Sequence, residues 1–442
     1  ASPPPAGAAG SAAADAGDAG APAHFAVGDR VLVTFPGEPP FEAVVWAVSG
    51  DAYTVRYCYD GELEERLDRG LLSAWRPDSG AKRLTLDELM IQDRLGEGTQ
   101  SEVLSGYLPG GAPVAVKLGL KRGAISREAA VLSALSGRVG FPLLLHHEHE
   151  GSATPGGCLV MEVLGPSLED LRRGKSGRAR LSGAPFLRVG RGVLRLLRRL
   201  HAAGFVHNDL KPANVLLGSG AELQPKPLHL IDFGSCTRAD GQLAGNEPTA
   251  SGPRGTPLFA SVAADEGREL MRPVDDVESL AYALAFLGAG GLPWQGKPDE
   301  IVLGMKRELM AGALGRSSIT DALRSDADAA ALEALWAEVR RCHSGEAQVD
   351  YDACLAALGG GEAGAGAEAE AEAEADRLGA CRPGEAPSSS RSSLKKATLT
   401  PSRSSSPYRQ SAHASSAPPR GALRLAAAEG AAGAARCSDE CA

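Results

Sequence analysis

The chain has 442 residues, with 46 lysines and arginines against 55 aspartates and glutamates, so its formal net charge is -9. This balance provides no overall basic field, and a nucleic-acid partner is therefore disfavoured. No stretch of eighteen apolar residues exists, which argues against a membrane-spanning helix and a membrane partner, and eight cysteines without a CxxC pair favour reduced thiols in the cytoplasm or nucleus.

The chain opens with a low-complexity stretch and then changes character. Residues 1–23 are rich in Ala, Gly and Pro and lack the features of a secretory or transit signal, so we expect a disordered leader. Residues 24–77 alternate apolar and polar positions between turn signals, which predicts four or five short strands and a small all-β barrel. The strings GDRVLVTF and YTVRYCYDGELEERL resemble Tudor-type SH3-like barrels.

Five aromatic residues of this barrel region admit two interpretations. One is a cation-π cage, which would make a methylated lysine or arginine peptide a partner of the barrel. The other is ordinary core packing, because alternation places several of these side chains on one face of a strand. The residues concerned are Phe41, Trp46, Tyr53, Tyr57 and Tyr59.

Residues 88–359 pass from strand-like segments to long helical patterns. Between Pro185 and Leu200 the apolar residues recur on one helical face and arginines on the other, which predicts an amphipathic helix packed on a core. From Gly360 the apolar periodicity ends. We expect residues 360–442 to form a disordered tail, first rich in Ala and Glu and then in Ser and Arg.

A glycine turn between two strand-like stretches begins the larger region. Its first two glycines would let backbone amides approach a triphosphate closely. Ser101 stands where a GxGxxG pattern has its third glycine, so we expect a stiffer tip. The nucleotide-binding residues predicted here are Leu95, Gly96, Glu97, Gly98 and Val103.

The sequence VAVK, which ends at Lys117, predicts a strand that points Ala115 and Lys117 to one face. A lysine directed at a cleft can pair with the α- and β-phosphates of a nucleotide. Glu128 shares a predicted helical stripe with Ile125 and Leu132, and an inward carboxylate requires a cation. We therefore predict an ion pair between Lys117 and Glu128.

The sequence HNDLKPAN carries the groups that phosphoryl transfer requires. Asp209 supplies a carboxylate for the attacking hydroxyl, Lys211 a cation near the phosphate, and Asn214 a metal ligand. Asp232 then opens a DFG sequence after a short apolar strand and suits a magnesium ion that bridges the phosphates. We therefore predict ATP and Mg²⁺ as cofactors. The predicted catalytic residues are Asp209, Lys211, Lys117 and Glu128, and the predicted metal ligands are Asn214 and Asp232.

The strings VMEVLGPSLEDL, DDVESL and LPWQG resemble the casein kinase I group of protein kinases, whose relatives include the tau-tubulin and vaccinia-related kinases. The resemblance implies a serine/threonine kinase acting on protein substrates and an α+β fold, in which a bilobal kinase domain follows the SH3-like barrel and both termini are disordered. It also implies that Met161 is the gatekeeper and that Asp276 braces the catalytic loop. The hinge residues it implies for adenine are Glu162, Val163 and Leu164.

The chain departs from the family pattern at three places. Asn208 stands where most kinases have the arginine that receives an activation-loop phosphate, so control by loop phosphorylation is not expected. Leu258, in the GTPLFAS string that replaces an A-P-E sequence, stands where the group has an arginine for a substrate phosphate, which leaves phospho-priming open. The connection between Lys117 and Glu128 is shorter than usual, although their ion pair remains geometrically feasible.

Two alternatives to an active kinase remain open from the sequence. One is a catalytically weak scaffold that keeps the kinase fold without turnover, and the other is a methyl-lysine or methyl-arginine reader acting through the barrel. The resemblance further implies that serines of the tail, such as Ser402 and Ser404, can be autophosphorylated and inhibitory; an unmodified linker is the simpler interpretation.

Overall fold

The computed structural model describes residues 24–75, 81, 84–98, 100–123, 125–148, 155–174, 179–219, 227–239, 252–312, 317–345 and 347–359. The leader and the tail expected to be disordered lie outside the described residues. Within the described ranges, helices and sheets are mixed, and the fold class is α+β as the sequence predicts.

The first described region is a five-stranded antiparallel sheet with strand order β4-β3-β2-β1-β5. Alternating residues build its core, because Val31 and Val33 of β1, Val45 of β2 and Val55 of β3 are almost fully buried. The assignment of this sheet to the Tudor type stays a prediction. The strands are β1 (Arg30–Val33), β2 (Phe41–Ser49), β3 (Ala52–Tyr57), β4 (Leu63–Asp68) and β5 (Leu72–Ala74).

The five aromatic residues considered for a cage do not converge. Tyr53 lies in the core, and its hydroxyl accepts a hydrogen bond from a backbone N–H. Trp46 is exposed beneath an arginine, and Tyr59 follows the end of β3 and packs in a separate apolar cluster, so strand alternation does not reach it. Only Phe41 and Tyr57 remain neighbours, with ring centroids 5.9 Å apart.

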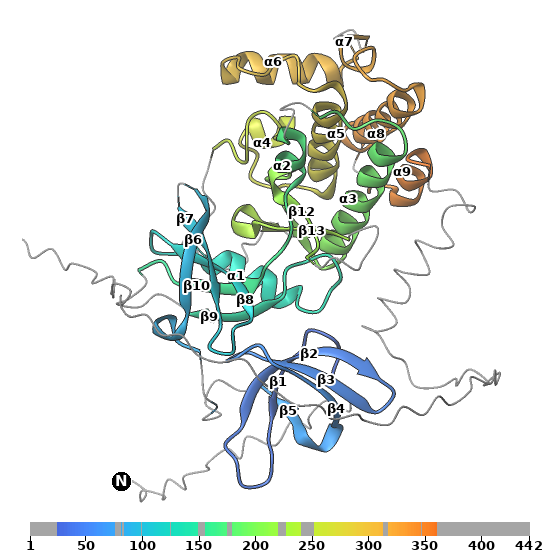
Figure 1. Ribbon diagram of the computed structural model, residues 1–442. Coiled ribbons are helices and arrows are strands. Elements are labelled where there is room, and N and C mark those ends of the chain that lie inside the picture. The colour runs from blue at the N-terminus through green and yellow to red at the C-terminus, as the bar shows by residue number, and fades with distance from the viewer. Residues whose placement is uncertain are drawn as a thin grey trace, which may run out of the picture. The chain divides into compact units, whose positions relative to one another are not determined.

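A second antiparallel sheet has the order β6-β7-β8-β10-β9 and opens the larger region (Figure 1). Helix α1 (Ser126–Ala134) packs against it and buries Glu128, Val131 and Leu132. The sheet therefore positions its lysine strand next to a helix that presents a carboxylate. Its strands are β6 (Met90–Glu97), β7 (Ser101–Tyr107), β8 (Pro113–Gly119), β9 (Leu144–Glu148) and β10 (Cys158–Glu162).

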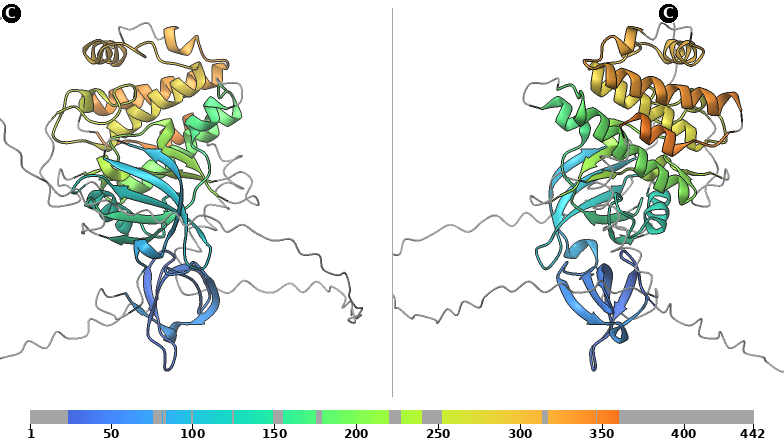
Figure 2. Two further views of the ribbon diagram at one scale, coloured as in Figure 1. Left: turned by 60° about the vertical axis from the view of Figure 1, so that its left-hand side comes forward. Right: turned by 90° about the vertical axis from the view of Figure 1, so that its right-hand side faces the viewer.

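The rest of the region is mainly helical. Helix α3 (Ala184–Ala202) is the amphipathic helix that the sequence predicts, and it packs beside α5 (Pro273–Ala289) and α8 (Asp326–Ser344), as Figure 2 shows. The other helices are α2 (Leu168–Arg173), α4 (Val262–Asp265), α6 (Asp299–Met310), α7 (Ser317–Thr320) and α9 (Tyr351–Ala357). Four short strands pair as β11 (Phe205–Val206) with β14 (Thr237–Arg238) and β12 (Val215–Leu217) with β13 (Leu228–Leu230).

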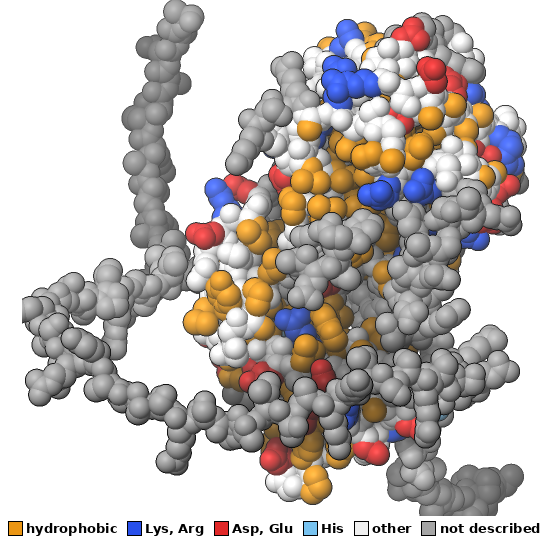
Figure 3. Space-filling view, turned by 45° about the vertical axis from the view of Figure 1, so that its right-hand side comes forward, with side chains coloured by type: hydrophobic (Ala, Val, Ile, Leu, Met, Phe, Trp, Pro, Cys, Tyr) orange, Lys and Arg blue, Asp and Glu red, His pale blue; other side chains and the backbone are white. Residues whose placement is uncertain are grey.

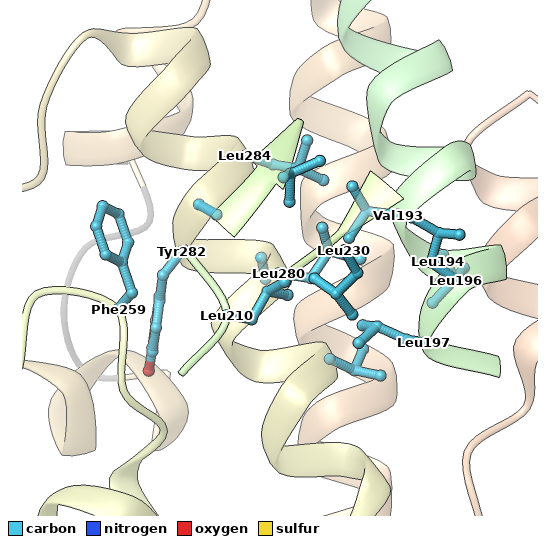
Figure 4. Close-up of a cluster of buried hydrophobic side chains, with 14 of the residues drawn as sticks. Val193, Leu194, Leu196, Leu197, Leu210, Leu230, Phe259, Leu280, Tyr282 and Leu284 are labelled. Atoms are coloured by element: carbon cyan, nitrogen blue, oxygen red, sulfur yellow. The ribbon is translucent and has the colours of Figure 1, made fainter. Parts of the chain in front are cut away.

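The core of this helical part fixes the polar segment 207–214. Figure 4 shows Leu210 of that segment and Leu230 of β13 among leucines from α3 and α5. Leu210 is 1% exposed, and burying a leucine side chain stabilises a fold by roughly 1.5–3 kcal/mol. The apolar anchor therefore holds in place the polar residues on either side of it.

The described surface and thiols agree with the composition. The face shown in Figure 3 has acidic and basic side chains interspersed, with apolar side chains between them. None of the described helices is both long and apolar enough to span a membrane. The cysteines within the described ranges are buried free thiols, namely Cys58, Cys158, Cys236, Cys342 and Cys354.

Candidate active site

The predicted ion pair is present. Lys117 Nζ on β8 lies 2.5 Å from Glu128 Oε2 on α1 and 2.9 Å from Asp232 Oδ1. Burial alone would lower the pKa of Lys117, but its pairing with the two carboxylates outweighs burial and raises that pKa. Lys117 is therefore a fixed cation, and α1 is held close to the sheet.

The DFG segment is fixed by contacts with α1 and with the polar segment. Asp232 adopts a left-handed backbone conformation, with φ of +67°. The Phe233 ring is fully buried and meets the His207 ring at 5.4 Å between centroids. Arg127 Nη1 donates to the Gly234 carbonyl at 2.9 Å. Helix α1 thus contributes two residues that help to place Asp232. Arg127 bonds to Gly234, and the adjacent Glu128 pairs with Lys117, which contacts Asp232.

The carboxylate of Asp209 is held on both sides. Lys211 Nζ donates to Oδ2 at 2.7 Å, and the Thr256 hydroxyl donates to Oδ1 at 2.8 Å. Lys211 also donates to Thr256 Oγ1 at 3.0 Å, and Asn214 Nδ2 donates to the Asp209 carbonyl at 2.9 Å. The three predicted residues of HNDLKPAN therefore converge, and Thr256 completes the group.

The sequence did not single out Thr256. Its only signal was its place in GTPLFAS, a string interpreted as the replacement of A-P-E. Contact between positions 209 and 256 depends on tertiary folding across a connection that no local pattern specifies.

Asp276 on α5 braces the segment that carries Asp209. Its carboxylate is fully buried and accepts backbone N–H bonds from His207 at 2.7 Å and Asn208 at 2.9 Å, and a ring N–H bond from His201 Nε2 at 2.8 Å. Burial would raise the pKa of Asp276, but these donors outweigh burial and lower it. The resemblance implied this brace, and the structure supplies its geometry.

Asn208 occupies the position of the arginine that most kinases use to receive a phosphate. Its backbone is left-handed, with φ of +65°, a conformation that asparagine tolerates better than most residues. Its Nδ2 donates to the Ser235 carbonyl at 2.9 Å and to Thr237 Oγ1 at 3.0 Å. The neutral side chain of Asn208 therefore joins the polar segment 207–214 to the residues after the DFG sequence.

The glycine turn is formed by the β6–β7 pair. Gly96 lies opposite Val103, and Gly98 N–H donates to the Ser101 carbonyl at 2.8 Å. A Cβ at Gly96 would meet nothing within 4 Å, so the backbone there is open to a ligand. Leu95 is 57% exposed on the neighbouring position. These positions fit the close approach of a phosphate chain to the backbone.

Ala115 and the proposed gatekeeper Met161 face each other across the β8–β10 pair. The carboxylate of Glu162 accepts the Leu143 N–H at 2.9 Å, and the Glu162 backbone N–H donates to the Leu143 carbonyl at 3.2 Å, so Glu162 ties the end of β10 to the residue before β9. The residues predicted to form the hinge follow Met161 directly and are partly buried: Glu162, Val163 and Leu164.

The donor set of Asn214 and Asp232 fits a magnesium ion. Both residues offer oxygen, which Mg²⁺ prefers. The Asn214 amide nitrogen is already used for Asp209, so its oxygen is the group left for a cation. The Asn214 backbone carbonyl accepts the Ile231 N–H at 3.0 Å, so the two predicted metal ligands are tied together through the backbone.

The comparisons with known proteins agree with this geometry. A protein kinase domain model matches residues 89–318. Casein kinase 1-like protein HD16 of Oryza sativa subsp. japonica is 39% identical over 173 residues, which is 38% of this chain and 24% of that relative. The chain thus spans about a quarter of the length of this curated relative. Since the matched family model covers just over half of the chain and includes the converging residues, the chain belongs to the protein kinase family.

Proposed function

We propose that this protein is a serine/threonine protein kinase of the casein kinase 1 type, which transfers the γ-phosphoryl group of ATP to hydroxyls of protein substrates. The observation that carries the proposal is the Asp209 carboxylate held between Lys211 and Thr256. The similarity to a casein kinase 1-like relative supports the type.

The roles of the side chains follow from their positions. ATP with Mg²⁺ supplies the phosphoryl group and neutralises charge as that group moves. Asp209 orients the substrate hydroxyl and takes its proton, because Lys211 and Thr256 leave its carboxylate no freedom to turn away. Lys117 binds phosphate oxygens, and Glu128 keeps it in place. Asn214 and Asp232 are the metal ligands of the proposal.

The proposed kinase needs no activation-loop phosphate. In many kinases a phosphate draws the catalytic segment and the following residues together through an arginine. Asn208 joins the same parts by neutral hydrogen bonds. We also propose an intracellular location, cytoplasmic or nuclear, which the free thiols among the described cysteines support.

The substrate preference proposed here is for hydroxyls without a neighbouring phosphate. Leu258 stands where the group has a phosphate-binding arginine, and it packs against the apolar core of the helical part. We expect kcat/KM to be nearly equal for phospho-primed and unprimed versions of one peptide. Leu258→Arg should raise the primed-to-unprimed ratio about tenfold, because a charge-assisted hydrogen bond is worth roughly 1.5–3 kcal/mol before solvent screening.

A peptide array with primed and unprimed sequences tests both the equal kcat/KM of the wild type and the raised ratio of Leu258→Arg. Leu270→Arg is the matched control, because Leu270 is 51% exposed and lies outside the GTPLFAS string. Lys117→Met gives the blank rate. A wild-type rate equal to that blank would contradict kinase activity and favour a scaffold, and a tenfold wild-type preference for primed peptides would contradict the proposed selectivity.

A second candidate function belongs to the first sheet. Phe35, Phe41 and Tyr57 are partly buried, with centroids 6.3 Å apart for the first pair and 5.9 Å for the second, and with steep interplanar angles of 60° and 67°. The Tyr57 hydroxyl donates to the Glu64 carboxylate. Steeply inclined rings beside an acid are suited to a methylated ammonium or guanidinium group. We infer that a methylated peptide is the ligand this cluster would take.

Titration of the full chain with trimethyl-lysine peptides tests this candidate. Phe41→Ala should weaken binding at least tenfold, because it removes the ring that touches both others. Trp46→Ala is the control, since Trp46 is an exposed aromatic of the same strand. If the spectrum of the protein does not change at millimolar peptide, the proposed binding of a methylated peptide is contradicted.

A further inference from the structure

The backbone of residues 257–262, here called the substrate segment, is held by side chains from two helices and the loop between them. Lys306 Nζ on α6 donates to the Pro257 carbonyl at 2.6 Å and to the Ala260 carbonyl at 2.7 Å. Trp294 Nε1 donates to the Leu258 carbonyl at 3.0 Å. Three of the carbonyls of the segment therefore depend on side chains far away in the sequence.

All three ammonium donors of Lys306 are used in hydrogen bonds. Its side chain is 0% exposed, and its third N–H donates to Asp265 Oδ2 at 2.7 Å. An ammonium has three donors, so none is left unused. Burial lowers the pKa of Lys306, and Asp265 opposes that effect. A lysine is rarely buried so completely, and each of its donors ends on the substrate segment or on the short helix that follows it.

The far end of the segment is fixed to α5. Glu278 Oε1 accepts the Val262 N–H at 2.8 Å and the Tyr282 hydroxyl at 2.7 Å. The Lys306 ammonium lies 5.3 Å from the centre of the Tyr282 ring, a cation-π distance. Figure 4 shows Tyr282 beside Phe259 of the segment. Helices α5 and α6 thus form one buried support beneath the segment.

The near end of the segment adjoins the catalytic group. Thr256, whose hydroxyl bonds to both Asp209 and Lys211, directly precedes Pro257. The carbonyl that Lys306 binds is therefore one residue from a side chain that orients the Asp209 carboxylate. A shift of Pro257 would therefore move Thr256 and the hydrogen bonds through which it orients the Asp209 carboxylate.

We propose that Lys306 is a positioning residue for protein substrate: its hydrogen bonds hold the substrate segment in register with Asp209. The inference rests on the proposed kinase function. Lys306 does not contact the residues assigned to ATP and Mg²⁺ in the described structure, so its loss should affect use of the protein substrate and leave nucleotide binding unchanged.

The test compares Lys306→Met, which keeps length and loses charge, with Lys306→Arg and with the control Lys297→Met, an exposed lysine before the same helix. For Lys306→Met we expect kcat/KM for peptide to fall about 10- to 100-fold, since small misplacements of reacting groups have effects of this size. The heat of Mg²⁺-ATP binding and KM for ATP should stay within about twofold. Lys306→Arg should recover part of the peptide rate, and Lys297→Met should match wild type.

The outcomes separate this inference from the proposed function. Peptide kinetics of Lys306→Met equal to wild type would overturn the inference, and so would a parallel loss of ATP and peptide binding, which indicates general core damage. If Lys306→Met does not fold, Asp265→Asn decides in its place, with a smaller fall for peptide alone expected and an unchanged peptide rate overturning the inference. A wild-type chain without phosphoryl transfer would overturn the proposed function itself.

Discussion

Asp209→Asn is expected to lower kcat for peptide phosphorylation by about 10²- to 10⁴-fold, the usual contribution of a positioned acid or base. Asparagine keeps the shape of the side chain and can still meet Lys211 or Thr256 through its oxygen, but it cannot take a proton from the substrate. Binding of Mg²⁺-ATP should change little, because the metal ligands assigned here are Asn214 and Asp232. Steady-state kinetics with calorimetry of nucleotide binding measures both quantities.

Asp232→Asn provides the contrast. The substitution changes a proposed metal ligand and weakens one of the two ion pairs of Lys117, so we expect the activity that remains to rise with added Mg²⁺. The activity of Asp209→Asn should not respond to added Mg²⁺. An Asp209→Asn protein that keeps more than a tenth of the wild-type kcat would show that another group accepts the proton.

The parts of the site that sequence could predict are those whose chemistry is local. Asp209, Lys211 and Asn214 stand in one short string with the spacing that the reaction requires. Glu128 could be assigned because its place on an apolar helical stripe required a cation, and the nearest suitable strand ended in Lys117. In each case a short-range pattern carried the information.

Lys306 and Thr256 show why the rest could not be predicted. Lys306 lies in a helix with other charged residues, where a lysine is expected to be solvated, and nothing local reveals that it is fully buried. Thr256 is an ordinary residue of a loop until folding brings it to Asp209. The five-residue aromatic cage did not assemble as a whole for a related reason: periodicity assigns faces only within a strand, and Tyr59 lies beyond the end of β3.

The position of Asp209 depends on residues outside the ion pairs of Lys117. Glu128 and Asp232 both pair with Lys117, yet Asp209 gets its position from segment 207–214, which contains a left-handed asparagine. A strained backbone persists only where its surroundings determine it. Here the surroundings are the Leu210 anchor and the carboxylate of Asp276, so the largest structural effect is expected at Asp276.

Asp276→Asn should reduce the free energy of unfolding by about 3 kcal/mol or more and kcat by at least a hundredfold. The native carboxylate accepts N–H groups from His207, Asn208 and His201. An asparagine amide has one oxygen, so whichever way it turns, its NH₂ group meets an N–H donor in a fully buried place. Urea unfolding monitored by fluorescence, together with peptide kinetics, measures the two effects.

The lowered pKa of Asp276 determines how the stability difference between wild type and Asp276→Asn changes with pH. The folded pKa of Asp276 is lowered, so its stabilisation is fully present above the usual aspartate pKa of about 3.9 and is lost only as pH falls through the folded value. The wild-type advantage over Asp276→Asn should therefore hold at pH 6–8 and shrink in acid. Asp352→Asn is the control, because Asp352 pairs with Arg198 at the surface and its side chain is 80% exposed. The free energy of unfolding of this variant should stay within about 0.5 kcal/mol of the wild-type value. Equal stability of the Asp276 and Asp352 variants at neutral pH would mean that the catalytic segment keeps its strained backbone without this brace.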